Sequence, residues 1–305
     1  MLPVLRALLL ERSVTRAGEA VGLSQPATSA ALARLRRRFG DELLTRKGRG
    51  FELTPFASTL LTRLEAASAA LERLFDEEFD SDTTTRSFSV IASDYATALL
   101  GQDINEVIAV EGKGHASIEL RQFGDNADIG GLLRQNDLVV VPQEATGGYP
   151  GAVLLHDRWV CIVAESNKDV GGQLTVEDLR RMPCVVPFSR NPIHFAPLHD
   201  LRRLGIEPNV EVVTDSFMSV AFLVVASDRV SFLQERYARM LRLITPIRIL
   251  ESPVDLGGIT LSMRWHPTLT DDPAHRWMRQ ILVRAAQRTM ERQGAERPSG
   301  HQAAR

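Results

Sequence analysis

Residues 12–53, RSVTRAGEAVGLSQPATSAALARLRRRFGDELLTRKGRGFEL, decide how the N-terminal part of this chain folds. Ser13 is a suitable N-cap for a short helix over 14–21, because its hydroxyl can accept a bond from a free backbone amide. Gly22 stands where the end of that helix needs a left-handed residue. Ser24 is placed to cap the next helix. The pattern therefore predicts two helices joined by a tight turn.

Apolar residues at helical spacing predict how this region packs. Leu2, Leu5, Leu8 and Leu9 indicate a first helix with one apolar face. Small residues at positions 17 and 20 would let two helices cross closely. The expected core of the later helices consists of Ala17, Ala20, Val21, Leu23, Ala31, Leu32 and Leu35.

The exposed face of the helix after Ser24 carries short hydrogen-bonding side chains first and arginines later. Side chains such as Gln25 can reach base edges in a major groove, and arginines can hold phosphates. A basic, glycine-rich tip at 46–50 lies between two apolar pairs, which predicts a β-wing. A solvated charged helix surface is the alternative. The predicted DNA-binding residues are Ser24, Gln25, Pro26, Thr28, Ser29, Arg34, Arg46, Lys47 and Arg49, with Arg36, Arg37 and Arg38 as further phosphate contacts.

Charge is divided unevenly along the chain. Residues 1–60 contain 10 basic and 5 acidic side chains, a net charge of +5, whereas the remainder contains 26 and 33, a net charge of −7. A basic head on an acidic body indicates that only the head meets a polyanion. The length of 305 residues, with 44% hydrophobic residues, suits two or three domains with real cores.

Cysteine usage and hydropathy bear on the compartment. With only Cys161 and Cys184, we expect buried reduced thiols and no disulfide framework. No apolar run approaches the roughly 20 residues that span a bilayer. We therefore expect a cytoplasmic protein with no membrane contact.

From Pro55 onward the apolar pattern becomes a heptad seam. A helix this long needs a partner for its apolar stripe. Pairing with the same helix of a second subunit is the favoured interpretation, and packing on the protein's own body is the alternative. The polar run 80–85 predicts a hinge after this helix. The seam residues are Leu60, Leu64, Ala67, Leu71 and Leu74.

Beyond the hinge, strand-like and helix-like segments alternate. Such alternation predicts parallel sheets covered by helices, and two clusters of segments predict two small α/β lobes. The expected strands are 88–92, 117–123, 138–141, 158–164, 184–187, 210–213, 230–233 and 260–265, and the expected helices include 194–204, 217–226 and 273–292.

These residues resemble the LysR-type transcriptional regulators, and the resemblance covers nearly the whole chain. Its most specific part is residues 12–55. The second half is most similar to the branch that contains nodulation regulators and aromatic-compound regulators. That similarity rests on RSFSVIASDY at 86–95, DRWVC at 157–161, MRWH at 263–266 and DPAHRW at 272–277.

The resemblance implies an α/β protein with a helical, winged helix-turn-helix head and a two-lobed body like the periplasmic solute-binding proteins. The chain would cross between lobes near Val160 and near Ile259. The expected domains are a DNA-binding domain at 1–54, a linker and dimerisation helix at 55–80, a hinge at 81–86, an effector-binding domain at 87–290 (lobe I 87–159 and 260–287, lobe II 160–259) and a flexible tail at 291–305.

The resemblance also implies an effector site in the cleft between the lobes, where strand C-termini and helix N-termini converge. For each matched residue, structural capping of a helix is the alternative role. A small organic effector, such as an aromatic acid or a phenol, is weakly favoured. The matched residues are Ser93, Asp94, Tyr95, Ser189, Asn191, His194, Asp215, Phe217 and His266.

We therefore expect a sequence-specific DNA-binding transcriptional regulator that is controlled by a small-molecule co-inducer. A dimer formed through residues 55–79 would read an inverted repeat in double-stranded DNA. A tetramer is also expected, and RNA polymerase is a candidate partner. An effector-independent architectural DNA-binding protein is the alternative.

An enzyme is disfavoured, because the sequence contains no nucleophile elbow, phosphate loop or metal-spaced His/Cys set. The acidic pair at 271–272 beside His275 is a weak metal-like cluster that fits a helix N-cap better. No catalytic residue, metal site or cofactor is expected.

Overall fold

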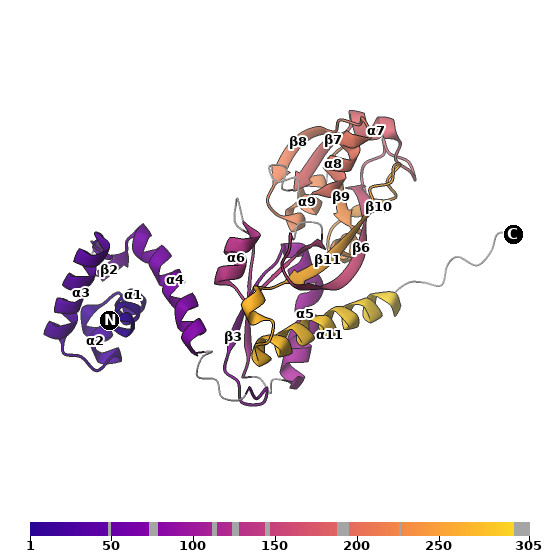
Figure 1. Cartoon of the computed structure of the whole chain (residues 1–305). Coiled ribbons are helices and arrows are strands. Elements are labelled where there is room, and N and C mark those ends of the chain that lie inside the picture. Colours follow the sequence, from indigo (N-terminus) through magenta and orange to yellow (C-terminus); the bar gives the residue numbers. More distant parts are fainter. Residues whose placement is uncertain are drawn as a thin grey trace. The chain divides into compact units, whose positions relative to one another are not determined.

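The computed structural model describes residues 1–47, 50–72, 79–111, 115–123, 128–143, 147–187, 195–225 and 227–295. The chain divides into two compact units, Met1–Glu78 and Phe79–Arg305 (Figure 1). No helix in the described ranges is long and apolar enough to cross a membrane.

Unit 1 begins with three helices, α1 (Leu2–Glu11), α2 (Val14–Ala20) and α3 (Gln25–Phe39). The Ser13 hydroxyl accepts from the Arg16 amide, and the Ser24 hydroxyl accepts from the Ala27 amide, each at 3.4 Å. Gly22 has a φ of 67°, the left-handed conformation that the turn requires. The two predicted caps and the glycine turn are confirmed.

The close crossing of α2 and α3 occurs at Gly18. A Cβ at that position would lie 2.8 Å from the Thr28 hydroxyl and 2.8 Å from the Leu23 carbonyl oxygen. Ala20 is exposed, so the prediction that it helps the helices cross is wrong, and Leu23 is also exposed. The inward stripe follows i, i+3, i+4, i+7 spacing, which excludes position 20. It consists of Val14, Ala17, Gly18 and Val21.

A short hairpin and a long helix complete unit 1. Strands β1 (Leu44–Lys47) and β2 (Gly50–Leu53) pair antiparallel, and α4 (Pro55–Glu72) follows. The Asp41 carboxylate accepts from the Leu43 amide at 2.7 Å and from the Thr54 hydroxyl at 2.6 Å. That hydroxyl accepts in turn from the Ala57 amide at 3.0 Å. The base of the wing is thereby tied to the start of α4.

The beginning of the heptad seam packs within unit 1. Leu64 is buried and Leu60 is partly buried against the core that α1 helps to form. Ala67 is exposed. The Leu71 side chain and Leu74 lie outside the described residues. The first two seam positions therefore follow the alternative interpretation, packing on the protein's own body.

The described residues of unit 2 form a nine-stranded sheet of order β4-β3-β5-β11-β6-β9-β7-β8, with β10 paired to β6. Its strands are β3 (Ser87–Ile91), β4 (Ser117–Arg121), β5 (Leu138–Pro142), β6 (Gly151–Ala164), β7 (Pro183–Pro187), β8 (Asn209–Thr214), β9 (Val230–Gln234), β10 (Ile247–Leu250) and β11 (Gly258–Arg264). Its helices are α5 (Asp94–Glu111), α6 (Ile129–Gln135), α7 (Val176–Arg181), α8 (Ala196–Arg203), α9 (Phe217–Val224), α10 (Glu235–Arg242), the 3-10 helix η3 (Pro267–Leu269) and α11 (Pro273–Ala295).

Strand β6 divides this sheet into two lobes. Its residues up to Arg158 pair with β11, and from Trp159 onward they pair with β9 and β10. We call the part with β3, β4, β5, β11, α5, α6 and α11 lobe I, and the part with β7 to β10 and α7 to α10 lobe II. The expected parallel pairing is found for β3 with β4 and β5 and for β7 with β8 and β9, whereas β6 is antiparallel to β9 and β11. The strand that was expected to begin at residue 158 begins at Gly151. The polar His156 and Asp157 interrupt its apolar pattern, so the sequence did not indicate the earlier part.

The core of unit 2 lies between the sheet and its covering helices. In lobe I, α5 and α11 cover one face, and α6 covers the other, where its Leu133 packs against Ile91 and Val141 (Figure 1). Cys161 and Cys184 are buried and free, and desolvation raises the pKa of each thiol to about 12. The prediction of two buried reduced thiols is confirmed.

A network of ion pairs connects the segments that precede β3, β5 and α11 in lobe I. The Arg86 guanidinium lies 3.0 Å from the Asp137 carboxylate and 3.2 Å from that of Asp272. Asp272 also accepts from the His275 amide at 2.8 Å, which confirms the acidic pair as an N-cap region. The neutral His275 ring bonds the Asp137 carbonyl at 2.9 Å and takes a bond from Arg279 at 3.1 Å. Helix α11 continues to Ala295, so the expected tail cannot begin at 291, and residues 296–305 lie outside the described part.

Candidate nucleic-acid interface and interlobe site

The first turns of α3 present an exposed surface of short side chains. Ser24, Gln25, Pro26 and Ser29 are exposed there, and Arg34 is exposed farther along the helix. Their positions follow from the buried stripe of Ala31, Leu32 and Leu35, which turns the opposite face of α3 to solvent. This arrangement is suited to entering a major groove.

Thr28 does not belong to that surface. It is fully buried, and its hydroxyl donates to the Ser24 carbonyl at 3.0 Å while packing beside Gly18. The prediction that Thr28 is exposed to bases is therefore wrong. Its position three residues after Gln25 turns it toward the α2 crossing, where it fixes the first turn of α3.

Three exposed alanines of α3, absent from the predicted DNA-binding set, share the solvent side with Gln25 and Ser29. Small apolar side chains allow close approach to DNA and can contact the thymine methyl group. The sequence has four alanines within 27–33, and only Ala31 among them was predicted in the core, where it lies. The exposed residues are Ala27, Ala30 and Ala33.

The arginines at the end of α3 have different roles. Arg36 donates to the Glu42 carbonyl at 2.8 Å and to the Leu44 carbonyl at 2.9 Å, so it holds the wing against α3. The expectation that Arg36 clasps phosphate is corrected by this arrangement. The arginines that remain exposed are Arg34, Arg37 and Arg38.

The wing adds two exposed cations beside α3. Arg46 is exposed, and the Lys47 ammonium lies 2.8 Å from the Glu52 carboxylate. An exposed pair of this kind is worth little, so Lys47 can exchange Glu52 for a phosphate. Arg49 lies outside the described residues. The wing and α3 together form a basic surface on unit 1.

Between the lobes of unit 2, the start of α5 reaches lobe II. Ser93 caps α5 by accepting from the Ala96 amide at 3.2 Å. Asp94 accepts from the Ser216 hydroxyl at 2.8 Å and from the Met218 amide at 2.9 Å, both at the start of α9. The neighbouring Asp215 is exposed.

Tyr95 links α5 to the point where the chain crosses between lobes. Its buried hydroxyl donates to the Asp157 carboxylate at 2.9 Å, and the Arg236 amide of α10 donates to the same carboxylate at 3.4 Å. Burial raises the pKa of Asp157 above its usual range and raises the pKa of Tyr95 well above 10. Arg158 beside it bridges Glu235 and Glu251 at 2.8 and 2.5 Å.

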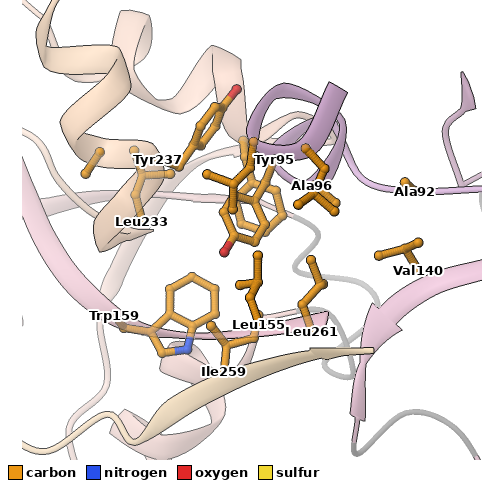
Figure 2. Packing of buried hydrophobic residues seen from close by; sticks show 14 of the residues in the cluster. Ala92, Tyr95, Ala96, Val140, Leu155, Trp159, Leu233, Tyr237, Ile259 and Leu261 are labelled. Atoms are coloured by element: carbon orange, nitrogen blue, oxygen red, sulfur yellow. The ribbon is translucent and has the colours of Figure 1, made fainter. Parts of the chain in front are cut away.

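Five aromatic side chains gather at this junction, and we call them the interlobe aromatic cluster. Figure 2 shows Tyr95 with Tyr237 of α10 and Trp159 of β6 around it. The Tyr95 and Tyr237 ring centroids are 5.7 Å apart, and those of Trp159 and Phe195 are 5.6 Å apart. Phe217, buried at the start of α9, lies 6.3 Å from Tyr95 and 6.4 Å from Trp159. The rings come from both lobes.

Several polar atoms in the interlobe aromatic cluster and in the neighbouring Gln234 have no hydrogen-bond partner although they are buried. They are the Trp159 indole N–H, the Tyr237 hydroxyl, and both amide atoms of Gln234. Trp159 and Gln234 are directly paired across β6 and β9, so their side chains share one face of the sheet. Buried polar groups are normally paired, so these atoms are exceptions in unit 2.

The structure brings together only some of the predicted effector residues. Ser93, Asp94, Tyr95, Asp215 and Phe217 lie at the junction of the lobes. Ser189, Asn191 and His194 lie outside the described residues.

His266 is at the opposite end of lobe I. Strand β11 runs antiparallel to β5, so its C-terminal Arg264 pairs with Val139 near the start of β5, away from the crossover at Gly258. His266 therefore lies away from the cleft. Its ring instead bonds the Thr268 hydroxyl at 2.7 Å.

Gln234 and Tyr237 were not among the predicted site residues, and Trp159 was named only within the DRWVC stretch at 157–161. A single glutamine that ends an apolar strand was the available signal for Gln234, because such a side chain must be buried or capped. Among the residues that the structure describes, no group of three or more His, Cys, Asp or Glu side chains is placed to hold a metal ion.

A basic winged helix-turn-helix in one unit and a two-lobed α/β domain with an interlobe site in the other define a class of DNA-binding regulators. The sequence model described as "Bacterial regulatory helix-turn-helix protein, lysR family" matches residues 1–58, and that of the "LysR substrate binding domain" matches 114–287. The chain belongs to the LysR family of bacterial transcriptional regulators, with a DNA-binding domain and an effector-binding domain.

Similar proteins support this membership. Nodulation protein D 3 of Rhizobium leguminosarum bv. phaseoli is 35% identical over 94% of this chain and 96% of its own length. Nodulation protein D 1 of Mesorhizobium japonicum is 33% identical over 94% and 93%. A probable transcriptional regulator, PA0477 of Pseudomonas aeruginosa, has a TM-score of 0.71 at 25% identity, covering 92% of this chain and 94% of that structure. Full-length CbnR in complex with its target DNA has the same fold, with a TM-score of 0.63 at 17% identity over 93% and 98%.

Proposed function

We propose that the interlobe aromatic cluster and its unpartnered polar atoms form the effector pocket of this regulator. The observation that carries the proposal is the coincidence of aromatic walls with buried Trp159, Gln234 and Tyr237 atoms that lack partners. Binding pockets combine apolar walls with a few such polar groups. A small organic molecule with an aromatic ring and hydrogen-bonding substituents fits that chemistry.

The same proposal assigns duplex DNA to the α3 and wing surface. Gln25 and Ser29 contact bases, with Ala27, Ala30 and Ala33 at close approach, while the backbone is held by Arg34, Arg46, Lys47 and Arg49. Two copies paired through residues 55–79 read an inverted repeat, and their further association gives a tetramer that contacts RNA polymerase in the cytoplasm. The exposed Ala67 of α4 supports pairing through the later part of that helix.

Effector control follows from differential affinity. A ligand between the lobes shifts the protein toward the lobe arrangement that binds it better, and this arrangement binds DNA differently. No catalytic step is needed for that role, and we assign none.

Tryptophan fluorescence tests the pocket directly. Full-length protein is titrated with a panel of aromatic acids and phenols, and the pocket predicts quenching by at least one of them. Trp159→Phe should abolish that quenching, whereas Trp265→Phe and Trp277→Phe, in lobe I, should keep it. Gln234→Leu should weaken binding by about tenfold, the effect of one lost hydrogen bond. Equal quenching in all three tryptophan variants contradicts the pocket.

A second measurement distinguishes a ligand-controlled regulator from an effector-independent architectural DNA-binding protein. Affinity for a native promoter and for random duplex is compared at one salt concentration, with and without the quenching ligand. A regulator prefers the promoter and changes its footprint with ligand, whereas equal affinity for both duplexes supports the architectural alternative.

A further inference from the structure

Asp94 accepts hydrogen bonds from residues of both lobes. It is the first residue of α5 in lobe I, yet one carboxylate oxygen accepts from the Ser216 hydroxyl at 2.8 Å and the Met218 amide at 2.9 Å in lobe II. The other oxygen accepts from the Tyr95 amide at 2.9 Å. Both oxygens of the carboxylate therefore accept hydrogen bonds, and two of its three bonds cross between lobes.

The partner of Asp94 is the N-terminus of an eight-residue helix, α9. Helix N-termini expose unpaired amides and a partial positive charge, and they favour an anion. Ser216 is the N-cap: its hydroxyl accepts from the Ser219 amide at 3.2 Å while donating to Asp94. Asp94 thus extends the cap of α9 with a charge from the other lobe.

The charge of Asp94 is balanced by this helix end. In the described ranges, no basic side chain forms an ion pair with Asp94. Tyr237 of α10 is an ionisable group near Asp94 from another element, and the negative charge of Asp94 contributes to raising the pKa of Tyr237. The Asp94 carboxylate is thus held at two helix N-termini, that of α5 through the Tyr95 amide and that of α9 through Ser216 and Met218.

We propose that Asp94 is an interlobe latch that acts as a built-in anionic ligand of α9. It holds the lobes together when no effector is bound, and it occupies the place where a carboxylate of an effector would otherwise bind. The part of the effector that reaches α9 is therefore uncharged. The inference rests on the proposed function in one respect: the cleft that Asp94 closes is the proposed effector cleft.

The latch is supported by weaker links elsewhere. Arg236 of α10 donates its side chain to the Gln293 side chain of α11 at 2.8 Å and its backbone amide to the Asp157 carboxylate at 3.4 Å. Removing Asp94 therefore loosens the lobes without separating them. The effect is best measured at the α9 amides themselves.

Hydrogen exchange of effector-free, DNA-free full-length protein tests the latch. In Asp94→Ala, the amides of Met218 and Ser219 should exchange at least about tenfold faster than in the native protein, because their opening is no longer opposed by the other lobe. Sodium formate at about 0.1 M should restore protection by filling the vacated place, as any ligand of the native state does. Sodium chloride at the same ionic strength should not.

Asp128→Ala is a matched control. Asp128 also caps a helix, accepting from the Gly130 and Gly131 amides at 3.2 and 2.8 Å, but both partners belong to its own helix, α6. Its removal should leave exchange at α9 unchanged with or without formate. Native-like protection of Met218 and Ser219 in Asp94→Ala, or loss of protection that formate and chloride restore equally, overturns the latch.

A titration with benzoate and phenol tests the exclusion of charge. Asp94→Ala should bind benzoate at least about tenfold more tightly than the native protein, the size of one charge-assisted bond at a helix end, with little change for phenol. Equal benzoate affinity in both proteins overturns the claim that Asp94 occupies a carboxylate position. These experiments differ from the test of the pocket, because formate rescue requires no binding at the aromatic cluster.

Discussion

The DNA-binding surface of α3 presents its side chains within residues 24–34, whereas the interlobe cleft joins residues that are 62 and 122 positions apart. In α3, one helix fixes the spacing of all the exposed groups, so a substitution changes one contact at a time. In the cleft, Asp94 and Asp157 accept hydrogen bonds from both lobes. The difference teaches that specificity for DNA can be altered locally, while the response to an effector depends on the packing of the whole of unit 2.

The two regions also differ in how they treat charge. The cations of unit 1 are mostly exposed and exchangeable, as in the Lys47–Glu52 pair. The ionisable groups of unit 2 include buried ones, such as His275 and Asp157, whose pKa values are shifted by burial. Acid should therefore affect unit 2 more strongly than unit 1.

The largest effect is expected from acidification through His275. Burial lowers the pKa of His275 to about 4, whereas the unfolded chain has its usual value near 6.5. The unfolded state binds the proton first as pH falls, so the stability present above pH 6.5 is lost on the way to pH 4. We expect a loss of about 2 to 3 kcal/mol between pH 7 and pH 4.5. Denaturant unfolding of the native protein and His275→Gln, at both pH values, measures it.

The variant acts as its own control, because it removes the titrating ring and leaves the carboxylates. Its stability should fall less with pH than that of the native protein. Parallel pH profiles would show that His275 does not set the acid sensitivity of unit 2.

The next effect concerns the helix crossing that supports the DNA-binding surface. Gly18→Val should push α2 and α3 apart and cost about 2 kcal/mol by overpacking. Promoter affinity should fall while the thermal transition of unit 2 stays unchanged. Ala20→Val, on the exposed side of the same helix, should leave promoter affinity close to native. Equal losses in both variants would place the crossing elsewhere.

A smaller and more selective effect is expected at Gln25. Gln25→Ala should remove about 1 to 2 kcal/mol of discrimination between base pairs while leaving affinity for random duplex unchanged. Competition binding on a promoter and on single-base variants, at one salt concentration, measures it. Uniform weakening on all duplexes would mean that Gln25 contacts the backbone.

The smallest effect is expected at the wing. Arg46→Gln should weaken binding to every duplex and lower the slope of log affinity against log salt concentration by about 1. Arg203→Gln, an exposed arginine of α8, is the control and should leave that slope unchanged. An unchanged slope in Arg46→Gln would remove this side chain from the phosphate contacts.

Local rules were sufficient where structure is local. Ser13, Ser24 and Gly22 could be assigned because caps and left-handed turns depend on a few adjacent residues. The burial of Thr28 and the exposure of Ala20 could not be assigned, because a shift of one position around a helix exchanges a buried side for an exposed one. On the predicted surface of α3, Thr28 is buried, and Ala27, Ala30 and Ala33 are exposed beside Gln25 and Ser29.

Topology limited the predictions for unit 2. Strand segments were recognisable, but nothing in their composition shows that β11 runs antiparallel to β5, which moves His266 to the far end of the lobe. Gln234 and Trp159 become neighbours only through the pairing of β6 with β9. A glutamine at the end of an apolar strand predicts burial without revealing what it will face.

The continuity of β6 has a mechanical consequence for regulation. Arg158 is paired to Gly258 and the next residue, Trp159, to Gln234, so no unpaired residue separates the two lobes along this strand. Rotation of one lobe against the other must twist a hydrogen-bonded ribbon, and its restoring force returns the lobes when the ligand leaves. Such a joint limits how far one lobe can rotate against the other.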